Sequence, residues 1–221
     1  MTKIVHPYAH RLGIIKDWKS RWFSVNADFR MHLKGDMLMR DWLTKNLKNQ
    51  YIGLVEIERN SKAIKVLINT SRPGVVIGKS GEGVIKIKNA LEKILVKIGE
   101  MKPNLQIEVI EIKSPEANAS IVSQMIAEGI EKRLHYRRVL KQTVEKVMAV
   151  KDVKGIRIYL GGRLAGADMA RSEEIKRGRI PLQTIRADID FCRHKAHMPY
   201  GDLGIKVWIY KGDIFAKNNK N

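Results

Sequence analysis

The chain has 221 residues, which is enough for one large domain or two modest domains that each bury a core. Lys and Arg number 42 against 23 Asp and Glu, so the net charge of +19 points to a polyanionic partner, while 44% hydrophobic residues exclude a disordered basic tail. The single Cys192 excludes an internal disulfide and fits a reducing compartment, and no signal-peptide core or bilayer-length apolar run indicates a membrane partner.

Residues 1–35 form a basic extension ahead of the first predicted helix. They carry seven Lys or Arg against two acids, with Trp18, Trp22 and Phe23 interleaved. Cations that neutralise phosphates, mixed with rings that can stack, suit contact with RNA. The same rings could instead pin the segment onto the domain behind it, and we expect the extension to pack there.

A helix and a hairpin are predicted next. Asp36 is a suitable N-cap for a helix over residues 37–47. Residues 54–59 and 63–68 are extended runs joined by a short polar turn, which predicts two antiparallel strands.

The loop Gly78-Lys79-Ser80-Gly81 is the most informative motif of the chain. Two glycines let the backbone approach an anion, Lys79 adds charge, and a helix begins directly after the loop. A nucleotide P-loop needs four residues between its glycines, whereas only three separate Gly74 from Gly78, which argues against that site. A simple glycine turn remains the plainer alternative. The following helix is predicted from one apolar stripe: Val84, Ile87, Leu91, Ile94, Leu95 and Ile98.

The order of elements around this loop resembles a known RNA-binding domain. A strand over residues 106–113 follows the helix, and its imperfect alternation predicts burial on both faces. Ser114-Pro115 then marks a domain boundary. The order αββααβ over residues 36–113 resembles the type II KH domain. This resemblance implies that Gly78, Lys79, Ser80 and Gly81 clamp single-stranded RNA.

Beyond the boundary, two helices are predicted around residues 122–130 and 140–148. Between them, residues 132–141 hold five cations in ten positions. If a helix starts near Tyr136, then Arg137, Arg138 and Lys141 fall in its first turns, where they oppose the helix dipole and repel one another. Such a cluster favours a surface that faces phosphates.

The last part of the chain is rich in strands, so the whole protein is expected to be α+β. Alternation predicts strands over residues 156–160 and 205–209, residues 184–191 resemble a third, and residues 167–175 are ambiguous. The C-terminal domain is therefore expected to pack two helices on a small mixed or antiparallel sheet. Cations gather around these strands beyond what solubility needs: Arg163, Arg171, Lys176, Arg177 and Arg179.

Three possible metal ligands lie near one another in this region. Cys192, His194 and His197 have no fourth ligand nearby and no second cluster, so we expect them to be loop side chains. We expect no metal, no cofactor and no catalytic residue in the chain.

Several sequence blocks together resemble the third protein of the small ribosomal subunit in its bacterial form. They extend from Thr2 to about Gly212 in one order, which makes them far more specific than the loop alone. The blocks are Val5-His6-Pro7, Arg11-Leu12-Gly13-Ile14, Arg72-Pro73-Gly74, Ile77-Gly78-Lys79, Arg137-Arg138, and residues 161–167, 178–182, 186–190 and 204–209.

This resemblance implies a structural protein of the 30S head that binds 16S rRNA and lies beside the tenth and fourteenth proteins of the subunit. It further implies a place at the messenger RNA entry channel, next to the fourth and fifth proteins, where Arg137, Arg138 and Lys141 contact mRNA and help to unwind it. Candidates for rRNA contact are Lys3, His6, Arg11, Arg163, Arg171, Arg177 and Arg179.

The expected organisation is an extension over residues 1–35, a KH domain over 36–113, a C-terminal ribosomal domain over 114–212 and a polar tail over 213–221. The expected setting is the ribosome of the bacterial cytoplasm, or of an organelle, within a ribonucleoprotein rather than a homo-oligomer. The alternative is a free KH regulator or RNA-processing factor, which would remain off the ribosome.

Overall fold

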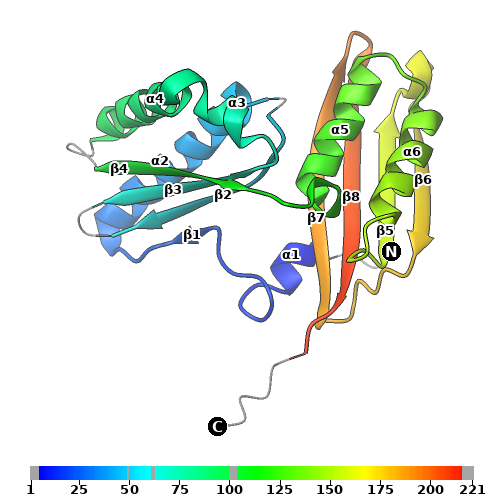
Figure 1. Cartoon of the computed structure of the whole chain (residues 1–221), viewed down its shortest axis with the longest axis horizontal. Coiled ribbons are helices and arrows are strands. Elements are labelled where there is room, and N and C mark those ends of the chain that lie inside the picture. Colours follow the sequence, from blue (N-terminus) through cyan, green and yellow to red (C-terminus); the bar gives the residue numbers. More distant parts are fainter. Residues whose placement is uncertain (1–4, 49, 61–62, 100–103, 216–221) are drawn as a thin grey trace. The chain divides into compact units, whose positions relative to one another are not determined.

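The computed structural model describes residues 5–48, 50–60, 63–99 and 104–215, and it divides the chain into two compact units (Figure 1). The first, here called the KH unit, is Trp18–Lys113. The second, here called the C-terminal unit, combines Met1–Asp17 with Ser114–Asn221. The predicted α+β architecture is confirmed, and the boundary at Ser114 coincides with the start of the longer segment of the C-terminal unit.

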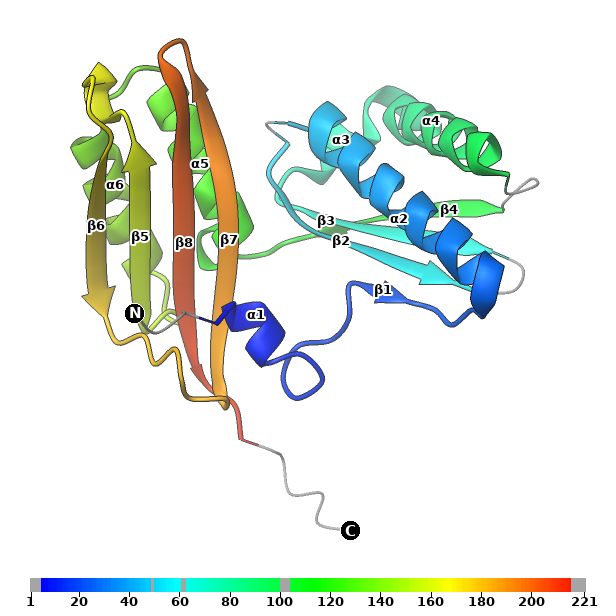
Figure 2. The same ribbon diagram turned by 180° about the vertical axis from the view of Figure 1, so that it is seen from behind.

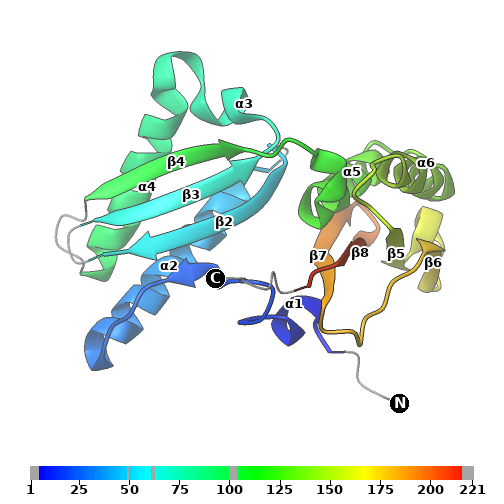
Figure 3. The same ribbon diagram turned by 60° about the horizontal axis from the view of Figure 1, so that its bottom comes forward.

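The KH unit is a four-stranded sheet with helices on one face (Figure 3). Its strand order is β1-β2-β3-β4, with β2 antiparallel to β3 and the two outer pairs parallel. In chain order its elements are β1 (Ser20–Arg21), α2 (Asn26–Asn46), β2 (Ile52–Arg59), β3 (Ile64–Thr70), α3 (Pro73–Ile77), the 3-10 turn η1 (Lys79–Gly81), α4 (Glu82–Ile98) and β4 (Leu105–Glu111).

The apolar stripes of the two long helices form the core of the KH unit against the sheet. Leu91 and Leu95 of α4 are fully buried, as predicted from their spacing, and Met39 and Leu43 of α2 join them. Ile68 supplies part of the sheet's side of this core. This packing holds α4 and the loop before it in a fixed place on the unit.

The prediction that Asp36 caps the first long helix is wrong. The helix α2 begins at Asn26, and Asp36 lies inside it, 3% exposed. Its carboxylate oxygen Oδ1 pairs with Arg59 Nη2 at 2.7 Å, and Oδ2 accepts a hydrogen bond from the indole Nε1 of Trp22 at 2.8 Å. A buried acid inside a helix is stable because both of its oxygens are paired, and this role is invisible in the local sequence.

The strand β4 also differs from its prediction. Only Leu105, Ile107 and Val109 turn toward the core, whereas Ile110 is 41% exposed. The strand is therefore buried on one face, because it lies at the edge of the sheet and helices cover a single side.

The C-terminal unit packs two helices on one face of a four-stranded antiparallel sheet of order β6-β5-β8-β7 (Figure 1). The second half of the ambiguous segment, residues 171–175, belongs to the edge strand β6. The elements are α1 (Pro7–His10), the turn η2 (Pro115–Ala117), α5 (Ala119–Glu131), α6 (Tyr136–Met148), β5 (Gly155–Gly162), the turn η3 (Leu164–Gly166), β6 (Arg171–Gly178), β7 (Ala187–Met198) and β8 (Gly201–Asp213). No helix within the described ranges is both long and apolar enough to cross a bilayer.

The prediction that the N-terminal extension packs on the KH domain is wrong for its first part. Residues 5–17 belong to the C-terminal unit, not to the KH domain, and α1 packs against β7. The anchor is Arg11, which is fully buried and donates to the carbonyl oxygens of Ala187 at 2.5 Å, Leu182 at 2.9 Å and Thr184 at 2.8 Å. The whole extension, residues 1–35, was predicted to pack on the KH domain, but only residues 18–35 belong to the KH unit.

Candidate nucleic-acid interface

The Gly-x-x-Gly loop has a backbone that its glycines make possible. Gly78 and Gly81 have φ values of 72° and 82°, and Ser80 lies between them at 51°. A Cβ on Gly83 would meet the carbonyl oxygen of Val76 at 2.3 Å, so only glycine lets α3 and α4 approach this closely. The loop thus projects from a tightly packed pair of helices.

This loop is chemically suited to a single RNA strand. Gly78, Lys79 and Ser80 are exposed, and Lys79 forms no ion pair within the described parts of the chain. Val75 and Ile85, on the two flanking helices, are 59% and 56% exposed. Exposed apolar side chains beside a cation can contact bases and phosphates together.

The predicted cation cluster lies on the exposed face of α6. The opposite face of the helix buries Val139, Leu140, Val144 and Val147, which leaves Arg137, Arg138 and Lys141 in solvent. The structure therefore brings these three cations together, as their spacing predicts. We call them the α6 patch.

One member of the α6 patch has a carboxylate partner. Arg137 donates to Glu173 of β6 at 3.1 Å, and this hydrogen bond raises the pKa of Arg137. Arg138 and Lys141 form no ion pair with any residue that the structure describes. The patch thus keeps net positive charge while one arginine is held in place.

The candidates for rRNA contact separate into structural and exposed residues. Arg11 is buried and its guanidinium donates hydrogen bonds to backbone carbonyls, so it is no longer a candidate for rRNA contact. His6 caps α1 and meets the ring of Phe191 at 4.8 Å. Arg163 holds a turn through Ala167 and Tyr200 at 3.0 and 3.1 Å.

The remaining candidates are open to solvent. Arg171, Arg177 and Arg179 are exposed, and the first two share a face of β6 with Glu173. That face lies on the side of the sheet where α6 packs, so both arginines extend the positive surface around the α6 patch. Lys3 lies outside the described residues.

The expectation that Cys192, His194 and His197 are loop side chains is wrong, because all three lie in β7. They form no metal-binding group within the described part of the chain. Cys192 lies beside the hydroxyl of Ser123, and His197 pairs with Asp202 at 2.8 Å.

Sequence reasoning did not identify Glu173 as a partner of Arg137 and gave no role to Arg157, Arg193 and Lys206. These three cations lie on different strands, and only the pairing of those strands brings them together. No local spacing could have revealed this.

A type II KH unit with an exposed Gly-x-x-Gly loop, joined to a second unit with a cationic helix, defines a KH-domain RNA-binding protein. Residues 38–117 match the family model described as KH domain, and residues 126–209 match Ribosomal protein S3, C-terminal domain. The chain is 46% identical over 217 residues to "Small ribosomal subunit protein uS3" of Caldicellulosiruptor saccharolyticus, covering 98% of this chain and 95% of that protein.

The chain belongs to the uS3 family of small ribosomal subunit proteins. It is a structural, RNA-binding ribosomal protein and not an enzyme. The resemblance inferred from the sequence blocks is confirmed, and the alternative of a free regulator is set aside.

Proposed function

We propose that this chain binds 16S rRNA in the head of the small subunit and lines the mRNA entry channel, where the α6 patch positions mRNA and helps to unwind it. The observation that carries this proposal is the exposed face of α6. There, Arg138 and Lys141 have no ion-pair partner in the described ranges, and Arg137 is only partly neutralised.

Unwinding by such a patch needs no nucleotide hydrolysis. A melted strand brings its phosphates to the cations, whereas a paired stem at the entrance presents them in a different geometry. Because the cations bind the open strand better, they shift the pairing equilibrium toward it. Arg137, fixed by Glu173, gives the patch one rigid contact.

The ribosomal setting supplies the remaining partners of the proposal. The tenth and fourteenth proteins of the subunit would be neighbours in the head, and the fourth and fifth would share the entry channel. The proposed cellular location is the ribosome of the bacterial cytoplasm. The exposed cations Arg171, Arg177 and Arg179 are assigned to rRNA.

Replacing Arg137 and Arg138 together by alanine is expected to slow translation through a stable mRNA hairpin severalfold while leaving the rate on an unstructured message unchanged. The measurement is single-turnover elongation on reconstituted ribosomes, with sedimentation to check assembly. A matched control, Lys93→Ala with Lys97→Ala, removes two exposed cations from α4. Equal rates of variant and parent on the hairpin message would disprove the role of the α6 patch.

Replacing Lys79 by glutamine tests the KH loop. One lost phosphate contact is expected to weaken binding to single-stranded RNA by roughly threefold to tenfold and to reduce the salt slope of log K by about 0.7. The measurement is fluorescence anisotropy of the full chain with oligo(U) at several salt concentrations. Lys93→Gln, farther along α4, is the control; a slope unchanged by Lys79→Gln would mean that the loop does not hold RNA.

A further inference from the structure

The face of the C-terminal sheet opposite α5 and α6 is here called the outer sheet face (Figure 2). The short helix α1 packs on this face near the start of β7, together with the loop residues Ile180 and Leu182. The side chains of the outer sheet face follow from the register. One row across the strands places Tyr159 opposite Lys206 and Lys206 opposite Arg193. The next row holds Lys176, Arg157, Trp208 and Phe191. These two rows of the outer sheet face therefore hold four cations and three rings, with Glu174 opposite Tyr159 as their one acid.

Each of three cations on this face is held over a ring. The guanidinium of Arg157 lies 4.8 Å from the Trp208 ring centroid, and Lys206 Nζ lies 5.1 Å from that of Tyr159. Arg193 lies 5.5 Å from the Phe191 centroid. These contacts restrict long side chains before any ligand arrives, which reduces the entropy cost of binding.

The charges of this face are not balanced within the protein. Arg157 pairs with Glu174 at 2.7 Å, but no acid among the described residues pairs with Lys176, Arg193 or Lys206. Arg193 and Lys206 are direct cross-strand partners, and like charges in such positions destabilise a sheet. A surface that keeps this arrangement is suited to an external anion.

The helix-free face of the KH sheet provides a comparison within the same chain. There, Lys65 pairs with Glu108 at 2.6 Å, and Arg21 pairs with Glu58 at 2.9 Å. An exposed sheet face in this protein can thus be neutralised by its own side chains, and the outer sheet face is not.

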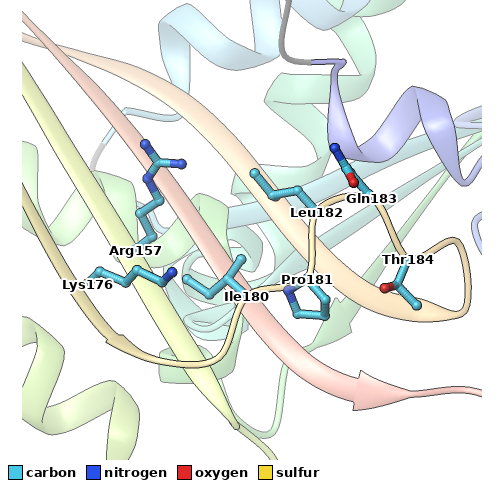
Figure 4. Close-up of a pocket in the computed structure, with 7 residues that line it drawn as sticks. All are labelled: Arg157, Lys176, Ile180, Pro181, Leu182, Gln183 and Thr184. Carbon is cyan, nitrogen blue, oxygen red and sulfur yellow. The ribbon is translucent and has the colours of Figure 1, made fainter. Parts of the chain in front are cut away.

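A recess of about 420 Å³ lies at one side of the outer sheet face. Arg157 and Lys176, from adjacent strands, line it together with the loop residues Ile180, Gln183 and Thr184 (Figure 4). The guanidinium of Arg157 and the ammonium of Lys176 offer several donors to a phosphate group in this recess.

We propose that the outer sheet face is a further RNA-binding surface that takes backbone phosphates of base-paired RNA, with one phosphate in the recess. The rings argue for paired RNA rather than splayed bases, because Trp208 is only 6% exposed and the cations occupy faces of the rings. This inference rests on membership of a ribosomal family and does not depend on the α6 patch.

The double variant Arg193→Gln with Lys206→Gln tests the proposal. The full chain is titrated with a fully base-paired RNA hairpin at salt concentrations between 50 and 200 mM. Loss of two phosphate contacts should make the slope of log K against log salt shallower by about 2, so that the fall in affinity over this range is roughly tenfold smaller. The charge-conserving exchange Arg193→Lys with Lys206→Arg should retain the original slope.

Lys45→Gln with Lys48→Gln removes the same charge from the end of α2 and the turn that follows it, and should leave the slope unchanged. An equal change in this control would overturn the proposal, because overall charge would then explain the binding. An unchanged slope in the Arg193 and Lys206 variant would also overturn it, and would leave an acidic protein segment as the partner of the face. Translation through hairpins reports on the α6 patch separately, so failure of one proposal is distinguishable from failure of the other.

Discussion

Replacing Arg11 by methionine is expected to lower the free energy of unfolding of the C-terminal unit by about 3 to 5 kcal/mol. The side chain is fully buried, and burial lowers its pKa while the charge of Asp188 opposes that shift. Methionine keeps much of the volume but removes the guanidinium donor from the carbonyls of Ala187, Leu182 and Thr184, of which Thr184 also accepts the Ala187 N–H. The expected loss arises because the buried carbonyl of Ala187 and the partly buried carbonyls of Leu182 and Thr184 lose a charged donor.

The measurement is urea denaturation combined with hydrogen exchange of peptides from residues 181–190. The exchange data identify the unit that is affected. Arg171→Met is the control, because it removes an exposed arginine of the same unit and should change stability by less than about 1 kcal/mol. An Arg11→Met loss as small as that of the control would show that the buried hydrogen bonds do not hold the N-terminal segment.

Replacing Asp36 by alanine is expected to destabilise the KH unit by about 3 to 5 kcal/mol, because the buried guanidinium of Arg59 then loses the carboxylate that neutralises it. The Asp36 and Arg59 side chains are 5% and 6% exposed, and two bonds of 2.7 and 2.8 Å join the guanidinium to one carboxylate oxygen. Trp22 also loses its acceptor, which loosens the connection between the start of the unit and α2.

The test is urea denaturation followed by hydrogen exchange of peptides from α2 and β2. Asp41→Ala removes an exposed acid from the same helix and should have little effect. A double variant, Asp36→Leu with Arg59→Met, should recover most of the stability, since it removes both charges. A double variant as unstable as Asp36→Ala alone would contradict the account based on a stranded charge.

Regular periodicity was sufficient to predict the elements with one clear apolar face. α4 and α6 show this well: Ile87, Leu91 and Leu95 recur at helical steps, and a start near Tyr136 placed the α6 patch correctly. The Gly-x-x-Gly motif could be predicted because its chemistry lies in consecutive residues. Its setting in αββααβ order is confirmed.

Features that depend on distant pairing were beyond the sequence. The helix α2 begins earlier than predicted. Its first turns could not be recognised from an apolar stripe, because Phe29 and Leu33 there are 45% and 53% exposed. Asp36 had the residue type of a cap, and its burial is explained by two partners outside the helix, Arg59 and Trp22. Arg11 belonged to a basic segment, and its partners lie up to 176 residues away.

The division of the C-terminal unit into two sequence segments has a consequence for synthesis. Arg11 bonds to Ala187, 176 residues later, and the entire KH unit lies between them in the chain. At translation speeds of about 5 to 20 residues per second, the nascent N-terminal segment must wait roughly 10 to 35 seconds before its acceptors exist. The KH unit can complete its own core in that interval, so the order of folding on the ribosome is expected to be middle first, with the two ends joined last.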